Sequence, residues 1–311
     1  EQTVAMPDTV MEDIQTKEAS FYHYAMILAT VTIWGGSFAS TKYALAQAEP
    51  LVIMCLRLLI GMPVLLAGSL MEGSLRLPTK GEAPALFLMG FQGIFFHQTI
   101  QSYAMKTAGA ANANWMMIAT PALVAILGRV FLKERISSKG VCGMILAAVG
   151  VGLVIGRGTV VTSNSGSFGS LGDVIMLLSV LNWAIFLVLS RRILKKDLPP
   201  AFVIFWEMLF ALLSAIPFTY IIGSDFSVIP SFTSGTWGAL IFLGAFSSAL
   251  AYIFWFRALA IFTVAKVAVF QFLQPMAGVV IAYFLVGERF TPWLFAGGAM
   301  ILSGVWLVNR K

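Results

Sequence analysis

Charged side chains are scarce in this sequence. Only 11% of its 311 residues are Asp, Glu, Lys or Arg, whereas about 25% is usual for a soluble domain. A water-soluble protein of this length could not cover its surface with so few charges. The scarcity therefore excludes a soluble globular protein, and it overrides the length-based expectation of two soluble domains.

Cysteine, histidine and catalytic sequence patterns are also nearly absent. The two cysteines, Cys55 and Cys142, fall inside apolar runs, which excludes a disulfide framework and a CxxC metal site. The two histidines are His23 and His97, and there is no HExxH, GxSxG or GxxxxGK-S/T pattern. The sequence thus contains none of these motifs for hydrolysis, ATP-driven chemistry or metal binding. We therefore expect a non-enzyme with no cofactor and no metal.

Long apolar runs make up most of what is present. Hydrophobic residues account for 59% of the chain, mean hydropathy is +0.88, and about 20 apolar residues suffice for a helix to cross a bilayer. Residues 1–21 are polar and acidic, and we interpret them as a disordered tail. The fold class predicted is an all-α membrane protein with ten transmembrane helices, at residues 22–43, 50–71, 83–105, 109–131, 138–156, 170–190, 200–223, 235–257, 264–286 and 291–308.

Basic residues are distributed unevenly between the two ends of these helices. With the N-terminus placed in the cytoplasm, 13 of the 20 Lys and Arg residues fall in cytoplasmic segments, four on the opposite side, and three inside or near the ends of spans. The positive-inside rule therefore places both termini in the cytoplasm. The same topology explains the net charge of +6, so we expect no nucleic-acid partner.

The two halves of the chain resemble each other. Residues 104–156 align with residues 258–310 without gaps at an offset of 154, and the matched landmarks are Pro121 with Pro275, Glu134-Arg135 with Glu288-Arg289, Gly143 with Gly297, and Gly150 with Gly304. Each half holds five helices, and this odd number forces the second copy to lie inverted. Inverted repeats are a transporter architecture, although a duplication could also merely enlarge a scaffold. We predict inverted repeats at residues 22–156 and 170–308.

In these features the chain resembles the drug/metabolite transporter superfamily, specifically its EamA-type members, over about residues 24–310. The segments that carry the resemblance are Ile33-Trp34-Gly35-Gly36-Ser37-Phe38, Arg57, the Ala104 to Ala111 stretch with Pro121, and the two Glu-Arg motifs, each followed by a glycine-rich helix. The resemblance implies a ten-helix bundle with a central cavity lined mainly by spans 1, 3, 4, 6, 8 and 9. It also implies a carrier of amino acids, related metabolites, nucleotide-sugars or drugs, and we expect it in a bacterial inner membrane.

Polar side chains interrupt several spans, and such groups usually face the protein interior. His97 and Gln101 are four residues apart, so they share a helix face. Amides, hydroxyls and aromatic rings together suit a zwitterion with an apolar end. We predict that the substrate-binding residues are Trp34, His97, Gln101, Asn112, Trp115, Trp183, Tyr252, Trp255, Gln271 and Gln274. The alternative is that these polar groups only hold helices together by hydrogen bonds.

Two charged residues lie deep in predicted spans, Arg57 in span 2 and Glu207 in span 7. A functional interpretation makes Arg57 a clamp for a substrate carboxylate, and Glu207 a proton-coupling group beside the other candidate, His97. We favour a structural or snorkelling role for both charges, because the resemblance does not place spans 2 and 7 along the path. Pro121 and Pro275 each free a backbone carbonyl, and we predict that they are gating hinges.

The combined prediction is a secondary transporter of small metabolites, first of all amino acids or related amphipathic compounds. We expect it to act as an exporter, by alternating access through a central cavity. The alternative among transporters is an efflux carrier for drugs or organic cations. A channel or an intramembrane enzyme is disfavoured, because the sequence shows no filter motif, no ring of like charges and no paired carboxylates inside spans.

The expected partners are the small-molecule substrate and the lipid bilayer. Substrate identity, direction, coupling to protons, and a monomeric or homodimeric state are left open.

Overall fold

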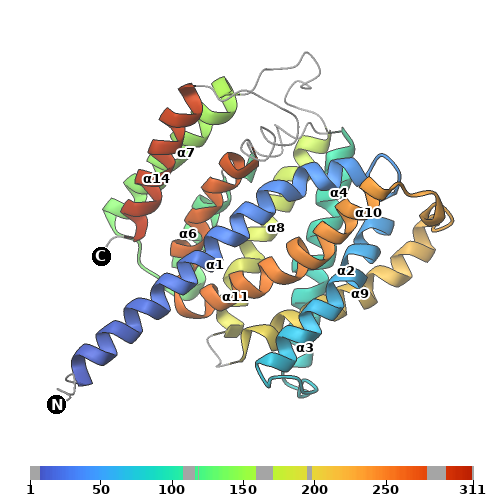
Figure 1. Cartoon of the computed structure of the whole chain (residues 1–311), viewed down its shortest axis with the longest axis horizontal. Helices are drawn as coiled ribbons and strands as arrows, with labels where there is room; N and C mark the ends of the chain where they lie inside the picture. Colours follow the sequence, from blue (N-terminus) through green and yellow to red (C-terminus); the bar gives the residue numbers. More distant parts are fainter. Residues whose placement is uncertain are drawn as a thin grey trace, which may run out of the picture.

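The computed structural model of the chain describes residues 8–107, 116–117, 119–158, 171–194, 198–278 and 292–309. Within these residues all regular structure is helical (Figure 1), so the predicted all-α class is confirmed. The helices are α1 (Asp8–Ala44), α2 (Pro50–Met71), α3 (Ala83–Met89), η1 (Gly90–Phe96), α4 (His97–Thr107), α6 (Ala119–Leu132), α7 (Ser138–Gly158), α8 (Leu171–Leu194), α9 (Pro200–Ile222), η2 (Ile229–Ser231), α10 (Ser234–Ile241), η3 (Phe242–Leu250), α11 (Ala251–Ile261), α12 (Val264–Ala268), η4 (Val269–Leu273) and α14 (Pro292–Asn309).

Several helices have the length and composition needed to cross a membrane. Four of the described helices qualify, namely Pro50–Met71, Val174–Leu194, Pro200–Ile222 and Ser234–Ile261. Shorter apolar helices cover Ala119–Leu132, Ser138–Leu153 and Phe295–Asn309. The total of ten spans and the side on which the termini lie stay predictions.

Helix α1 begins earlier than the sequence analysis predicts. It starts at Asp8, so residues 8–21 are helical where we expect a disordered tail. No Gly or Pro occurs between residues 8 and 21, and these are the residues that most strongly interrupt a helix. The apolar span that starts at residue 22 therefore continues upstream as helix.

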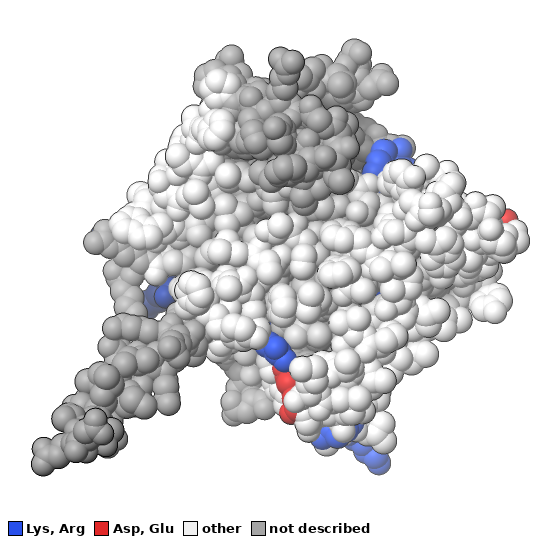
Figure 2. Space-filling view, in the orientation of Figure 1, with Lys and Arg blue, Asp and Glu red and all other residues white. Residues whose placement is uncertain are grey.

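The surface matches the composition. On the face shown in Figure 2, the charged side chains of the described residues form only small, separate patches, and most of the surface that these residues make is uncharged. Large apolar side chains project outward from the helices, for example Leu59 on α2, Ile126 on α6 and Leu213 on α9, each more than half exposed. Such an extended apolar exterior is unfavourable in water and is expected for helices that face lipid.

Helices α7 and α14 pack side by side (Figure 1), and glycines allow their backbones to approach closely. A Cβ atom on Gly143 would lie 2.7 Å from the carbonyl oxygen of Gly304, and one on Gly150 would lie 2.6 Å from that of Gly297. The order of the contacts is reversed along the two helices, so α7 and α14 run antiparallel. Because the sequence repeat equates Gly143 with Gly297, equivalent helices here point in opposite directions.

At one end of the bundle, carboxylates from the first half bond to the second half. Glu72 pairs with Arg257 at 2.7 Å and accepts a hydrogen bond from the amide of Ala201 at 3.0 Å. Glu134 accepts a hydrogen bond from the amide of Val264, the first residue of α12, at 3.0 Å. Each carboxylate therefore lies at the N-terminus of a helix from the other half, where the helix dipole favours a negative charge.

The same contacts define the direction of a second equivalent pair, α2 and α9. These helices pack against each other, and Glu72, just after α2, meets Ala201 in the first turn of α9. Farther along, Cys55 near the start of α2 and Thr219 near the end of α9 line one apolar groove. Helices α2 and α9 are thus antiparallel as well.

Candidate functional site

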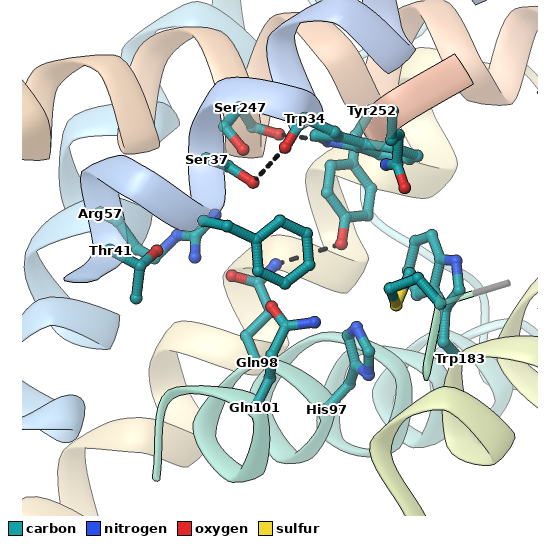
Figure 3. Close-up of a pocket in the computed structure, with 13 residues that line it drawn as sticks. Trp34, Ser37, Thr41, Arg57, His97, Gln98, Gln101, Trp183, Ser247 and Tyr252 are labelled. Carbon is teal, nitrogen blue, oxygen red and sulfur yellow. Dashed lines mark hydrogen bonds between the residues drawn. The ribbon is translucent and has the colours of Figure 1, made fainter. Parts of the chain in front are cut away.

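A polar cavity lies in the centre of the bundle, between residues of both halves (Figure 3). Its volume is about 50 Å³, which is room for on the order of three to five water molecules. A larger ligand can enter only when the surrounding helices or side chains move apart. The lining residues are Trp34, Ser37, Phe38, Thr41, Arg57, His97, Gln98, Gln101, Met117, Trp183, Ser247, Tyr252 and Gln274.

The structure brings six of the ten predicted substrate-binding residues to this cavity, namely Trp34, His97, Gln101, Trp183, Tyr252 and Gln274. Trp255 and Gln271 are buried but do not line it. Asn112 and Trp115 lie outside the described residues. Whether any of these side chains binds substrate stays a prediction, but their clustering is the arrangement that the prediction requires.

Aromatic rings form one wall of the cavity. Trp34 contacts the rings of Trp183, Tyr252 and Trp255, with centroids 5.5, 5.4 and 5.0 Å away. The indole of Trp34 also donates a hydrogen bond to the Ser247 carbonyl at 3.1 Å, which fixes the ring. Trp34 therefore joins α1 to α8, η3 and α11, and the wall offers both apolar area and electron-rich ring faces to a ligand.

His97 is held between α4 and α8. Its ring stacks on Trp183 with centroids 4.9 Å apart and planes 23° apart. Its Nδ1 atom lies 2.9 Å from Ser179 Oγ and 3.1 Å from the Ser179 carbonyl oxygen. These contacts give the imidazole one orientation at the cavity wall. A coupling role for His97 stays a prediction.

Two amide side chains of the cavity lining have unused hydrogen-bonding capacity. Gln98 donates from Nε2 to the Tyr252 hydroxyl at 3.1 Å, but its Oε1 atom is buried without a hydrogen-bond partner among the described residues. The Oε1 atom of Gln274 is likewise buried without a hydrogen-bond partner among the described residues. Buried acceptors of this kind are normally satisfied, so a polar ligand that donates hydrogen bonds would find partners here.

Arg57 lies at the central cavity, whereas the sequence analysis favours a structural or snorkelling position away from the path. Its side chain is 6% exposed, so it does not snorkel to the bilayer surface, and it lines the central cavity. Its Nε atom donates to Ser248 Oγ at 2.8 Å. Span 2, which we do not expect to line the path, therefore contributes a side chain to this cavity. The sequence signal for Arg57 is an arginine inside an apolar run. Ser37, Thr41 and Gln98 also line the cavity, although they are not among the predicted substrate-binding residues. Their sequence signal is a polar side chain inside a span.

Glu207 is fully buried on α9 and does not line the cavity. Neither carboxylate oxygen has a hydrogen-bond partner among the described residues. Its backbone lies against α3 and η1, because a Cβ atom on Gly90 would overlap the Glu207 carbonyl oxygen. A proton-coupling role for Glu207 stays a prediction.

The two predicted hinges differ in their surroundings. Pro121 is buried in the first turn of α6. Pro275 lies two residues after η4, a stretch of 3-10 helix over Val269–Leu273. A 3-10 stretch inside a longer helix often marks a hinge, so the backbone next to Pro275 is already irregular. Gating by either proline stays a prediction.

Comparison with known proteins points to one family. A model of the EamA-like transporter family matches residues 22–156 and again residues 170–310. An uncharacterized transporter of Archaeoglobus fulgidus is 27% identical over 289 residues, which cover 93% of this chain and 97% of the relative. YyaM, an uncharacterized transporter of Bacillus subtilis, is 28% identical over 294 residues, which cover 91% of this chain and 92% of the relative.

A third relative has a more specific name. It is the "Probable terminal-alkyne amino-acid exporter" of Streptantibioticus cattleyicolor, and it is 25% identical over 289 residues, which cover 93% of each protein. A solved structure matches with a TM-score of 0.76 at 20% sequence identity, and the match covers 94% of this chain and 96% of that one. The structural match shows that the overall fold is shared.

Proposed function

The chain belongs to the EamA-like transporter family, and from this premise we propose that it exports amino acids or related amphipathic metabolites by alternating access through the central cavity. The observation that carries the proposal is the cavity itself, which combines amides, hydroxyls, a guanidinium and a wall of aromatic rings. Such a set can replace the water around a zwitterion while the rings cover an apolar side chain. Transport as the general function follows from the family, and relatives named as transporters agree with a non-enzyme.

Two further observations support amino acids and export. A relative with similar length carries the name of an amino-acid exporter. Organic cations, the alternative substrates, would meet the buried Arg57 guanidinium at the cavity wall, and two like charges in a low-dielectric site repel strongly. We place the protein in a bacterial inner membrane, in agreement with its bacterial relatives.

The directions of equivalent helices support alternating access. Helices α7 and α14 run antiparallel, as do α2 and α9, and the cavity takes side chains from both halves. Two copies of one unit that lie inverted in a bilayer can exchange conformations, and the cavity then opens to the other side. The contacts of Glu72 and Glu134 would hold one of the two openings closed.

The proposed function is tested with purified protein in liposomes. Labelled amino acids with aliphatic and aromatic side chains, and labelled cationic drugs, are offered to vesicles with and without the protein. We expect protein-dependent counterflow of one or more amino acids and none of the cations. Counterflow of cations alone would favour the drug-efflux alternative, and absence of any counterflow would contradict the proposal.

We predict that Glu72→Gln increases access to the cavity from the side of the membrane that carries residue 72. Glu72 makes a 2.7 Å ion pair with Arg257, and both side chains are less than one-third exposed. A hydrogen bond to a charged group contributes about 1.5 kcal/mol or more, which corresponds to roughly a tenfold change in the open population. The measurement is the rate at which an impermeant maleimide alkylates a cysteine introduced by Ser37→Cys, with Cys55 and Cys142 replaced by alanine.

The matched control for this experiment is Glu82→Gln. Glu82 pairs with Arg76 at 2.7 Å within one connecting segment of the first half. Arg76 itself lies over the Phe202 ring of α9, and Glu82→Gln leaves that contact between the halves in place. Hydrogen bonds from Arg76 lower the pKa of Glu82 to about 2, so the substitution removes an ionised carboxylate at neutral pH. The control should leave the alkylation rate unchanged, and equal rates in both variants would show that Glu72 does not hold the cavity closed.

A further inference from the structure

Arg57 is a buried cation with an incomplete set of partners. A guanidinium has five N–H donors, and the structure gives Arg57 one hydrogen bond, from Nε to Ser248 Oγ at 2.8 Å. No Asp or Glu of the described part of the chain forms an ion pair with it. A buried charge without a counter-ion is costly, so a site of this kind is completed by an anionic ligand.

Close backbone packing holds Arg57 at this position. A Cβ atom on Gly244 would lie 2.7 Å from the Arg57 carbonyl oxygen, and one on Gly61 would lie 2.9 Å from the Gly244 carbonyl oxygen. Glycines on both helices thus let α2 approach η3 closely, and Ser248 of η3 binds the guanidinium. The charge is therefore positioned by the fold before a ligand arrives, as recognition of a small anion requires.

The rest of the cavity suits the remainder of an amino acid. Figure 3 shows Arg57 and Thr41 on one side, and Trp183 and His97 on the other. Gln98 lies between them, with an Oε1 acceptor that has no partner within the described residues. A ligand with a carboxylate at one end, an ammonium group beside it and an apolar side chain would meet a guanidinium, an amide oxygen and aromatic rings in that order.

We propose that Arg57 binds the carboxylate of the transported compound and thereby restricts the substrates to carboxylates, excluding the corresponding amines and esters. The planar guanidinium matches a carboxylate through two parallel hydrogen bonds. The inference rests on the proposed transport of amphipathic metabolites and names the group of the substrate that the protein recognises. An analogue without the carboxylate charge, such as the ester or the amine, would leave the buried Arg57 without a counter-ion and would therefore bind less well.

The test compares one transported amino acid with its methyl ester and its decarboxylated amine, in liposomes that contain the wild type, Arg57→Lys, Arg57→Gln or Arg129→Gln. Arg129 is exposed on α6 and does not line the central cavity, so it is the matched control. We expect Arg57→Gln to raise the KM for the amino acid at least tenfold, Arg57→Lys to raise it less because the charge remains, and Arg129→Gln to leave it unchanged. Transport of the ester and the amine by the wild type should be weak.

Each outcome has a definite meaning. An unchanged KM in Arg57→Gln, or equal transport of acid, ester and amine by the wild type, would overturn the assignment of Arg57 while transport as such would stand. If Arg57→Gln does not fold, the test is competition in liposomes with the wild type, where an excess of the ester or the amine is added to the labelled amino acid. We expect neither compound to reduce transport of the amino acid, and inhibition by both would overturn the assignment of Arg57. Absence of transport of every compound by the wild type would instead contradict the proposed function.

Discussion

Replacement of Gly90 or Gly244 by alanine is expected to leave little folded protein. A Cβ atom on Gly90 would overlap the Glu207 carbonyl oxygen, and one on Gly244 would lie 2.7 Å from both the Arg57 carbonyl oxygen and the Ile60 Cβ atom. Backbone atoms cannot rotate aside, so the helices would have to separate. Overpacking of a well-packed interior costs about 1–3 kcal/mol and sometimes more, and we expect the upper end, with Tm falling by roughly 6 °C or more.

The two glycines also test the repeat, because they are related by the same offset of 154 residues as the other landmarks. Their substitutions should therefore have similar effects. The control is Gly238→Ala, since a Cβ atom at that position of α10 would meet nothing within 4 Å and alanine favours the helix. The measurement is the amount of monodisperse protein after heating in detergent. A Gly90→Ala variant as stable as Gly238→Ala would contradict the close approach of these helices.

Substitution Trp34→Ala is expected to lower the transport rate per folded protein strongly. Trp34 contacts three other aromatic rings and donates a hydrogen bond to the Ser247 carbonyl of η3. Without the indole, the wall that would cover the apolar part of a substrate is lost, and we expect the initial rate in liposomes to fall at least tenfold. Trp34→Phe keeps a ring but not the hydrogen bond, so it should retain part of the activity.

The matched control is Trp237→Ala on α10. Trp237 is 36% exposed, contacts Phe232 and does not line the central cavity. Its replacement should leave the transport rate per folded protein unchanged. Transport by Trp34→Ala at the wild-type rate would show that the aromatic wall is not part of the substrate path.

The sequence alone is sufficient to predict the all-helical class, the bounds of α2 and several residues that line the cavity. Apolar runs bounded by Pro and Gly predict α2 with the bounds that the structure shows, because the bilayer fixes the length of a span. Polar and aromatic residues inside such runs face inward, and this explains why Trp34, His97 and Tyr252 meet at one cavity.

The remaining features depend on how the helices pack. Trp255 is three residues after Tyr252, about 60° away around a helix, and it packs behind Trp34 instead of reaching the cavity. The direction in which Arg57 points is set by the approach of α2 to η3 at Gly244. Neither the rotation of a helix about its axis nor its distance to a non-sequential neighbour can be obtained from an apolar run.

The transport mechanism depends on one arrangement, in which two units that are inverted with respect to each other in the bilayer enclose the cavity. This arrangement is tested most directly by labelling equivalent connections in a protein whose Cys55 and Cys142 are replaced by alanine. Lys80 follows α2 and Asp225 follows α9, and both are exposed. With the variants Lys80→Cys and Asp225→Cys in intact cells, we predict that an impermeant maleimide labels residue 225 from outside and residue 80 only after the membrane is opened. Labelling of both cysteines from the same side would contradict the inverted arrangement and the transport mechanism that depends on it.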